Sequence, residues 1–207
     1  MAHDIPDLPL PEEIAVMTLP RVVLLPHSLL PLHIFEPRYR LMLSHALAGD
    51  RRFAVAQQLE LPDFDLNPSD MAPVIGVGLI RACVEREDGT SDLVLQGLQR
   101  ARVTGLSQAE PFPTVRIVDF PTVNADPEQT RDLIWQIQEH SRRLRAAGYR
   151  LPEQLDEHIG QITDPELFCD LMAAAYLRSP AIRRKVMEMS DIGNRLGLVL
   201  DVMKEMA

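Results

Sequence analysis

The sequence is poor in cysteine and in positive charge, and each shortage excludes a class of protein. Its 207 residues include two cysteines, Cys83 and Cys169, which lie far apart in apolar surroundings. This arrangement favours buried free thiols in a reducing compartment over a disulfide framework or a zinc site. Lys and Arg number 21 against 30 Asp and Glu, for a net charge of -9. Because nucleic-acid binding draws on a clustered excess of basic residues, this balance argues against a nucleic-acid partner.

Long apolar runs are also missing. No stretch approaches the roughly 18 uninterrupted apolar residues that a membrane span needs, and the N-terminus lacks the basic and apolar parts of a signal peptide. Two short basic groups do occur, at 142–145 and 183–185, but acidic residues stand near both, so we interpret them as solvated helix faces. We therefore expect a cytoplasmic protein without a membrane partner.

The chain lacks the motifs of common hydrolases and metal sites. GxxxxGK[ST], GxSxG, HExxH and CxxC are all absent. The nearest approach to a phosphate loop is Gly76-Val77-Gly78, which lies inside an apolar run and is better read as a strand bulge or a place of close packing. His33 and Glu36 are close in sequence, but a metal needs further converging ligands. We predict no catalytic residue, no metal and no cofactor.

What is present divides the chain near residue 122. From about residue 14 onward, short runs of branched apolar residues alternate with turn residues, which predicts a β lobe over 10–122. Asp88-Gly89 between two such runs predicts a tight hairpin. Residues 37–48 instead repeat apolar side chains at helical spacing, so one helix should interrupt the strands. The strands are expected at 53–58, 74–84, 91–98, 101–106 and 114–120.

Beyond residue 122 the chain shows one helix start after another. Asp126, Asp164 and Ser179 each precede a proline, whose missing N–H costs nothing in the first helical turn. Three helices should begin there, a further one near Pro152, and a last one should run from about Asp191 to Met206. We expect a helical bundle over 123–207, and hence an α+β fold.

The segment from Leu24 to Leu43 combines many apolar residues with three prolines and then becomes charged. Because proline lacks a donor and fixes φ, this segment cannot be a central strand throughout and should run partly extended, partly as a loop. Its apolar side chains must pack across the β lobe or line a groove at its edge. Glu36 can cap the following helix and pair with Arg38 or Arg40.

At these residues the sequence resembles the LON substrate-binding domain family, the amino-terminal domain of the ATP-dependent protease Lon. The run from Pro31 to Tyr39, PLHIFEPRY, reproduces a motif of the family's stand-alone bacterial members. The glycines of 75–78, the Asp88-Gly89 hairpin and the run 95–103 resemble a strand pair of the family, and 162–167 is a weaker third match.

The resemblance implies a PUA-like β pseudo-barrel with one inserted helix, followed by an α-helical bundle. It also implies the recognition part of Lon without its ATPase and Ser-Lys protease parts. The function to expect by analogy is that of a stand-alone, non-catalytic module that binds unfolded or apolar polypeptide segments or a partner protein, such as a separate protease or ATPase. The residues that match the family motifs, and that we interpret as structural, are Pro31, His33, Glu36, Pro37, Arg38 and Gly97.

A proline-stiffened segment loses little entropy on binding, and an exposed strand edge can add an extended peptide through main-chain hydrogen bonds. We therefore predict a polypeptide-binding surface on this segment, although core packing is the alternative for each of its residues. Two further functions stay open. A hydrolase would gather His33 or Glu36 with a titratable group from a distant strand, and RNA binding is known for PUA-like lobes. Self-association is left open as well. The predicted binding residues are Leu29, Leu30, Leu32, Phe35 and Tyr39.

Overall fold

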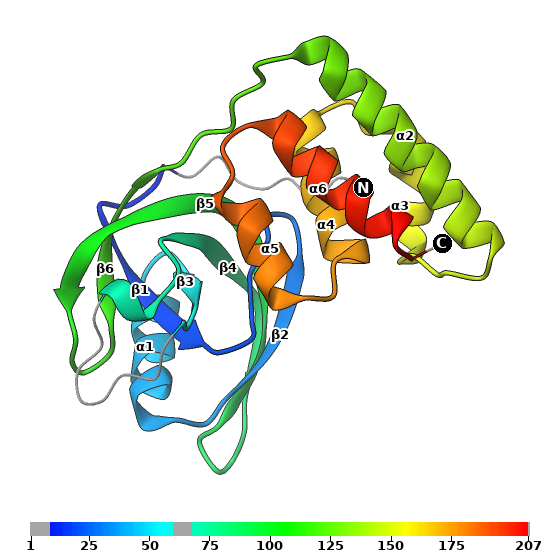
Figure 1. Cartoon of the computed structure of the whole chain (residues 1–207). Helices are drawn as coiled ribbons and strands as arrows, with labels where there is room; N and C mark the ends of the chain where they lie inside the picture. Colours follow the sequence, from blue (N-terminus) through cyan, green and yellow to red (C-terminus); the bar gives the residue numbers. More distant parts are fainter. Residues whose placement is uncertain (1–8, 60–67, 207) are drawn as a thin grey trace. The chain divides into compact units, whose positions relative to one another are not determined.

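The computed structural model describes residues 9–59 and 68–206, which form two compact units (Figure 1). The units are Met1–Phe120 and Pro121–Ala207, so the division falls two residues before the predicted one. The described strands lie in the first unit and helices α2 to α6 in the second, which confirms the α+β class. None of the described helices is long and apolar enough to cross a membrane.

The first unit is built on a barrel-like ring of strands. The strand order is β2-β5-β4-β3-β1-β6, and β6 pairs with β5 as well as with β1. β5, β4, β3, β1 and β6 therefore follow one another around a ring, and β2 is added beside β5, as expected for a pseudo-barrel. The strands are β1 (Glu13–Leu19), β2 (Leu29–Ile34), β3 (Arg52–Gln57), β4 (Val74–Glu85), β5 (Ser91–Gln108) and β6 (Thr114–Asp119).

The long strand β5 corrects one prediction. The two strands expected at 91–98 and 101–106 form a single strand of 18 residues. Gln99 and Arg100, between them, are polar but are not turn residues, so nothing ends the strand. Irregularities in its pairing with β4, at Val77/Gly78 and Ile80/Ala82, allow the local bending that β-bulges produce. β5 can thus pair with β2 at its start and with β6 at its end.

The predicted hairpin joins β4 to β5. Gly89 has a φ of 76°, which only glycine adopts readily. The N–H of Arg86 donates to the carbonyl of Thr90 at 2.8 Å, and the carboxylate of Asp88 accepts from the N–H of Thr90 at 2.9 Å. The hairpin therefore forms where the Asp-Gly pair predicted it, but of these two residues Gly89 alone has a positive φ.

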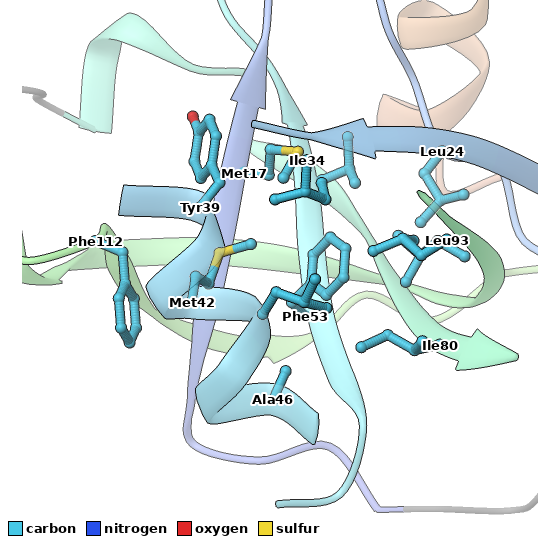
Figure 2. Close-up of a cluster of buried hydrophobic side chains, with 13 residues drawn as sticks. Met17, Leu24, Ile34, Tyr39, Met42, Ala46, Phe53, Ile80, Leu93 and Phe112 are labelled. Carbon is cyan, nitrogen blue, oxygen red and sulfur yellow. The ribbon is translucent and has the colours of Figure 1, made fainter. Parts of the chain in front are cut away.

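Helix α1 (Pro37–Ala48) packs on the outside of the ring and matches its predicted bounds. Its buried residues, Tyr39, Met42, Leu43 and Ala46, join a cluster of apolar side chains that also includes Phe53 (Figure 2). A second cluster draws residues from all five strands of the ring and so lies inside it. Strand β3 is consequently buried on both faces, which is why its sequence shows no polar alternation.

The second unit contains the five predicted helices: α2 (Pro127–Ala146), α3 (Glu153–His158), α4 (Pro165–Tyr176), α5 (Pro180–Glu188) and α6 (Ile192–Lys204). Asp126 accepts from the N–H groups of Glu128 and Gln129, and Asp164 accepts from that of Leu167, so both act as caps. Ser179 occupies the corresponding position before α5 but makes no side-chain cap bond.

One of the two basic groups is not a solvated face. Arg142 and Arg143 do pair with Glu139 on the surface of α2. Arg183, in contrast, donates from Nε to the carbonyl of Leu177 at 2.7 Å and from Nη2 to that of Ala174 at 3.0 Å. The last carbonyl groups of a helix have no hydrogen-bond donor within the helix. At the end of α4 the Arg183 guanidinium donates to two of these carbonyls. Burial lowers the pKa of this guanidinium.

A buried ion pair joins α4 to α6. Arg195 Nη2 contacts Asp170 Oδ1, and both side chains have 0% exposed area. Arg195 Nη1 also donates to Thr122 Oγ1 and to Glu166 Oε1, each at 3.2 Å. Burial alone would lower the pKa of Arg195, but the nearby negative groups, Asp170 first, outweigh it and raise this pKa above its ordinary value. The attraction between Arg195 and Asp170 therefore allows both side chains to stay charged while they are buried in the bundle.

Candidate polypeptide-binding site

The prediction for this site depends on a turn at residues 25–28. The N–H of Ser28 donates to the carbonyl of Leu25 at 3.2 Å, with Pro26 second in the turn and His27 third. His27 has a φ of 61°, as the third residue of a type II turn requires. The turn is fastened to β5 by two bonds, from the His27 N–H to the Gly97 carbonyl at 2.8 Å and from the Gly97 N–H to the Ser28 carbonyl at 2.9 Å.

The chain leading into this turn lies directly on glycines of the ring. A Cβ atom on Gly76 would stand 2.1 Å from the carbonyl oxygen of Leu24, and one on Gly97 would stand 2.1 Å from that of Leu25. Both leucine side chains are buried. The proline-rich segment therefore packs across the β lobe, as predicted, and the glycines of Gly76-Val77-Gly78 serve close packing.

Strand β2 continues from the turn. Its residues Leu29 to Ile34 pair antiparallel with Gln96 to Ser91 of β5. Among the described strands, β2 has β5 as its single neighbour, so the other edge of β2 faces no strand. Pro31, which has no N–H to donate, is tolerated there because an edge strand does not need every donor. This edge is a template for a further strand.

The two faces of β2 differ. Leu30 and Leu32 are half-buried against the core cluster, and Ile34 is fully buried. Leu29 and Phe35 point away from it and are 65% and 61% exposed. The predicted set thus divides into residues that hold β2 on the lobe and residues that stay accessible.

Neighbouring strands extend the exposed side of β2. Residues opposite one another in an antiparallel pair point to the same face, and Pro31 lies opposite Val94, which in turn lies opposite Ala82 of β4. Two residues before Val94 on β5, Asp92 lies opposite Val84 of β4, which is 65% exposed. We call this set the apolar strip: the exposed residues Leu29, Pro31, Phe35, Ala82 and Val84, and the half-buried Val94.

A polar group interrupts the strip between Pro31 and Phe35. His33 Nδ1 lies 2.8 Å from Asp92 Oδ1, and Arg86 Nε donates to Asp92 Oδ2 at 2.7 Å. The hydrogen bond from His33, and then that from Arg86, hold the pKa of Asp92 below its ordinary value. The ring of Phe35 stacks on that of His33 with centroids 6.1 Å apart. His33 thereby links the charged group to the apolar strip.

Comparison with known proteins decides the family of this fold. The chain matches the model of the ATP-dependent protease La (LON) substrate-binding domain over residues 13–205. It belongs to this family. The match runs across the division at Phe120 and so covers residues of both units.

The relatives extend well beyond this domain. The Lon protease of Trichlorobacter lovleyi is 27% identical over 198 residues, which are 95% of this chain and 24% of the relative. The Lon protease of Escherichia coli K12 is 27% identical over 196 residues, 93% of this chain and 24% of the relative. The chain thus spans about a quarter of the length of these curated relatives.

Two solved structures share the fold. The N-terminal domain of a Mycobacterium avium complex Lon protease superimposes with a TM-score of 0.71 at 18% identity, covering 94% of this chain and 100% of that one. A Lon N-terminal domain protein from Xanthomonas campestris gives a TM-score of 0.64 at 18% identity, covering 91% and 97%. At this identity the similarity establishes the architecture and nothing finer.

The remaining motif residues of this LON domain have structural contacts. Tyr39 is 3% exposed, and its hydroxyl lies 3.2 Å from the Thr18 N–H, so we leave Tyr39 out of the binding surface (Figure 2). Pro37 occupies the first turn of α1. Glu36 precedes it but makes no cap bond, because its Oε2 is held by Arg38 at 2.9 and 3.0 Å. The predicted pairing with Arg38 is confirmed, and the predicted capping is wrong.

The hydrolase hypothesis required His33 or Glu36 to meet a titratable group from a distant strand, and His33 does meet Asp92. The two side chains are 50% and 43% exposed, however, and within the described residues His33 hydrogen bonds to Asp92 alone. A hydrogen-bonded His–Asp pair on an exposed surface is not by itself a nucleophile with its base.

Sequence reasoning missed Ala82, Val84 and Val94. All three lie in runs that were predicted as strands, so their alternation was visible. Their place beside Leu29 and Pro31 depends on the strand register, which the sequence does not display.

The bond between His33 and Asp92 leads to a pH prediction. We expect His33→Ala to raise the pKa of Asp92 toward its ordinary value, because the largest cause of its depression is removed. A depressed carboxyl pKa stabilises the fold above the unfolded-state pKa, and this contribution is lost as the pH falls through the folded-state pKa. Carboxyl-carbon NMR titration of Asp92 would measure the shift. His45→Ala, on the exposed side of α1, should leave the titration unchanged.

Proposed function

We propose that this LON domain is a non-catalytic module that binds extended polypeptide segments along the free edge of β2. The observation that carries the proposal is that β2, whose outer edge pairs with no described strand, also carries part of the apolar strip. Backbone groups at the edge supply hydrogen bonds to any sequence, and the strip supplies preference for apolar side chains.

Preorganisation supports this role. The turn at 25–28 is bonded to Gly97 on both sides, and Leu24 and Leu25 are anchored in the core. Leu30, Leu32 and Ile34 hold the inner face of β2 against the lobe. A binding strand that is already fixed loses little conformational entropy when a partner is added, so a larger part of the contact energy appears as affinity.

The dimensions support a short segment as the ligand. Leu29 and Phe35 stand at opposite ends of the strip, six positions apart, which at about 3.3 Å per residue is roughly 20 Å. An extended ligand of about six residues would span them, with alternate side chains on the strip. The net charge of -9 favours ligands that are not acidic.

The comparisons support a protein ligand in general terms. The matching family model is named for substrate binding, and the curated relatives are named proteases. We propose that this chain shares the recognition of polypeptide substrates. The proposal does not include the catalytic activity of the relatives.

The proposal is tested by titrating a fluorescently labelled, permanently unfolded polypeptide and following its anisotropy. We expect saturable binding that Leu29→Asp and Phe35→Asp each weaken about tenfold or more, since each places a charge in an apolar contact. Leu41→Asp is the matched control, because Leu41 is 50% exposed on α1, outside the strip. Absence of saturable binding by the folded protein, or an equal loss in the control, would contradict the proposal.

A further inference from the structure

The only tryptophan of the chain, Trp135, lies on the outward face of α2 and is 66% exposed. The buried residues of α2 are Thr130, Ile137, Ser141 and Leu144, which share the opposite side of the helix at 3.6 residues per turn. Trp135 therefore makes no contribution to the core of the bundle. Tryptophan is enriched at the centres of protein interfaces, so its placement needs a partner to explain it.

Charged residues flank Trp135 at equal distances on either side along α2, and the two residues at each distance have opposite charges. Arg131 and Glu139 stand four residues to either side of Trp135, and Glu128 and Arg142 stand seven residues to either side. These spacings place all five side chains on one stripe of the helix. Read along α2, the stripe is negative, positive, tryptophan, negative, positive.

We propose that this stripe is a self-association interface, in which the α2 helices of two copies pack antiparallel about a twofold axis with Trp135 at the crossing. In an antiparallel pair, residues equally distant from Trp135 on opposite sides meet. Arg131 of one copy then faces Glu139 of the second copy, and Glu128 faces Arg142 of the second copy. Every charge on the stripe meets its opposite.

The pattern favours a second copy of this chain over an unrelated partner. A twofold interface brings the same surface together with itself, so it requires a surface that is its own complement. The sequence of signs on the stripe meets this requirement only for antiparallel helices, because parallel packing would place like charges opposite one another. A central aromatic residue with charged residues around it is also the usual anatomy of an interface.

The existing ion pairs of the stripe do not oppose this arrangement. Glu128 and Arg131 pair within α2 at 3.8 Å with side chains 91% and 75% exposed, and Glu139, which is 27% exposed, pairs with Arg142 at 2.8 Å and with Arg143 at 3.0 Å on the same helix. Exposed pairs of this kind contribute little to stability, so a second copy can share or exchange them at small cost. α2 has 20 residues and is about 30 Å long, so two such helices bury a small area, and we expect a Kd on the order of 10–100 μM.

Sedimentation equilibrium of the full chain from about 1 μM to about 1 mM would bracket this range. We expect the mass to rise toward that of a dimer, and the emission of Trp135 to shift to the blue in step, because Trp135 is the only tryptophan. A monomer at every concentration would overturn the proposal. A dimer that forms without a change in Trp135 emission, or that survives Trp135→Ser, would overturn it as well.

A charge exchange tests the antiparallel register. Arg131→Glu and Glu139→Arg should each weaken the dimer about tenfold or more by placing like charges opposite, and the double variant should restore it. Lys204→Glu, an exposed charge change at the end of α6, is the control. Circular dichroism would verify that each variant is folded. Single variants that weaken the dimer without rescue in the double variant would exclude this register, and Trp135→Ser should leave polypeptide binding at β2 unchanged.

Discussion

Replacing Gly97 with alanine is expected to lower the free energy of unfolding of the strand unit by at least about 3 kcal/mol. The added Cβ would lie 2.1 Å from the carbonyl oxygen of Leu25 and 2.9 Å from its carbonyl carbon. These are backbone atoms, and the turn that contains them is bonded to Gly97 on both sides. The turn cannot move away from a new methyl group without breaking those hydrogen bonds.

Urea unfolding followed by far-ultraviolet circular dichroism would measure this loss. Trp135 fluorescence is unsuitable, because Trp135 belongs to the other unit and two units need not unfold together. Gly105→Ala is the matched control in the same strand, since its Cβ would meet the end of the flexible Arg116 side chain, with Nη2 at 2.7 Å, and not backbone atoms. A Gly97→Ala loss as small as that of the control would mean that Leu25 does not press on the glycine.

The weakened turn should also affect recognition. Because Gly97 fixes the turn that begins β2, Gly97→Ala should weaken polypeptide binding even under conditions in which the variant remains folded. Binding that survives with unchanged affinity would mean that the ligand does not use β2. The close backbone contact between Gly97 and Leu25 thus affects both the stability of the strand unit and its proposed function.

Replacing Arg195 with methionine is expected to cost about 3–5 kcal/mol of stability in the helical unit. Methionine matches the aliphatic part of arginine but leaves the carboxylate of Asp170 buried without its main counter-charge. Thr122 and Glu166 would lose their bonds to Arg195 at the same time. The loss should therefore exceed that of an ordinary cavity.

A double replacement separates charge from packing. Arg195→Met with Asp170→Leu removes both charges, and since apolar residues of similar volume can substitute for a buried ion pair, it should recover most of the loss. Thermal unfolding followed by circular dichroism at low protein concentration would compare them. Arg143→Met, which breaks an exposed pair with Glu139, should change stability by less than about 0.5 kcal/mol. A double variant no more stable than Arg195→Met would show that packing, not charge, dominates.

The sequence by itself determined the local elements of this protein. The Asp-Pro pairs located the starts of α2 and α4, Asp88-Gly89 located the hairpin, and the spacing of apolar residues gave α1 its bounds. The PLHIFEPRY run identified the family, which implied the pseudo-barrel. These features depend on residues that are close along the chain, so short-range conformational preferences are enough to specify them.

Only the tertiary structure decided which side chains are accessible. Tyr39 and Phe35 are four residues apart and similar in chemistry, yet Tyr39 is buried on the inner face of α1 and Phe35 is exposed just after the end of β2. Val84 joins Leu29 on one surface only through the register of β4, β5 and β2, and a slip of one residue would reverse the faces. Arg183 was likewise predicted from the sequence to be solvated, but in the structure it donates to a carbonyl at the end of α4. Such contacts join residues that are distant in sequence, so no local pattern contains them.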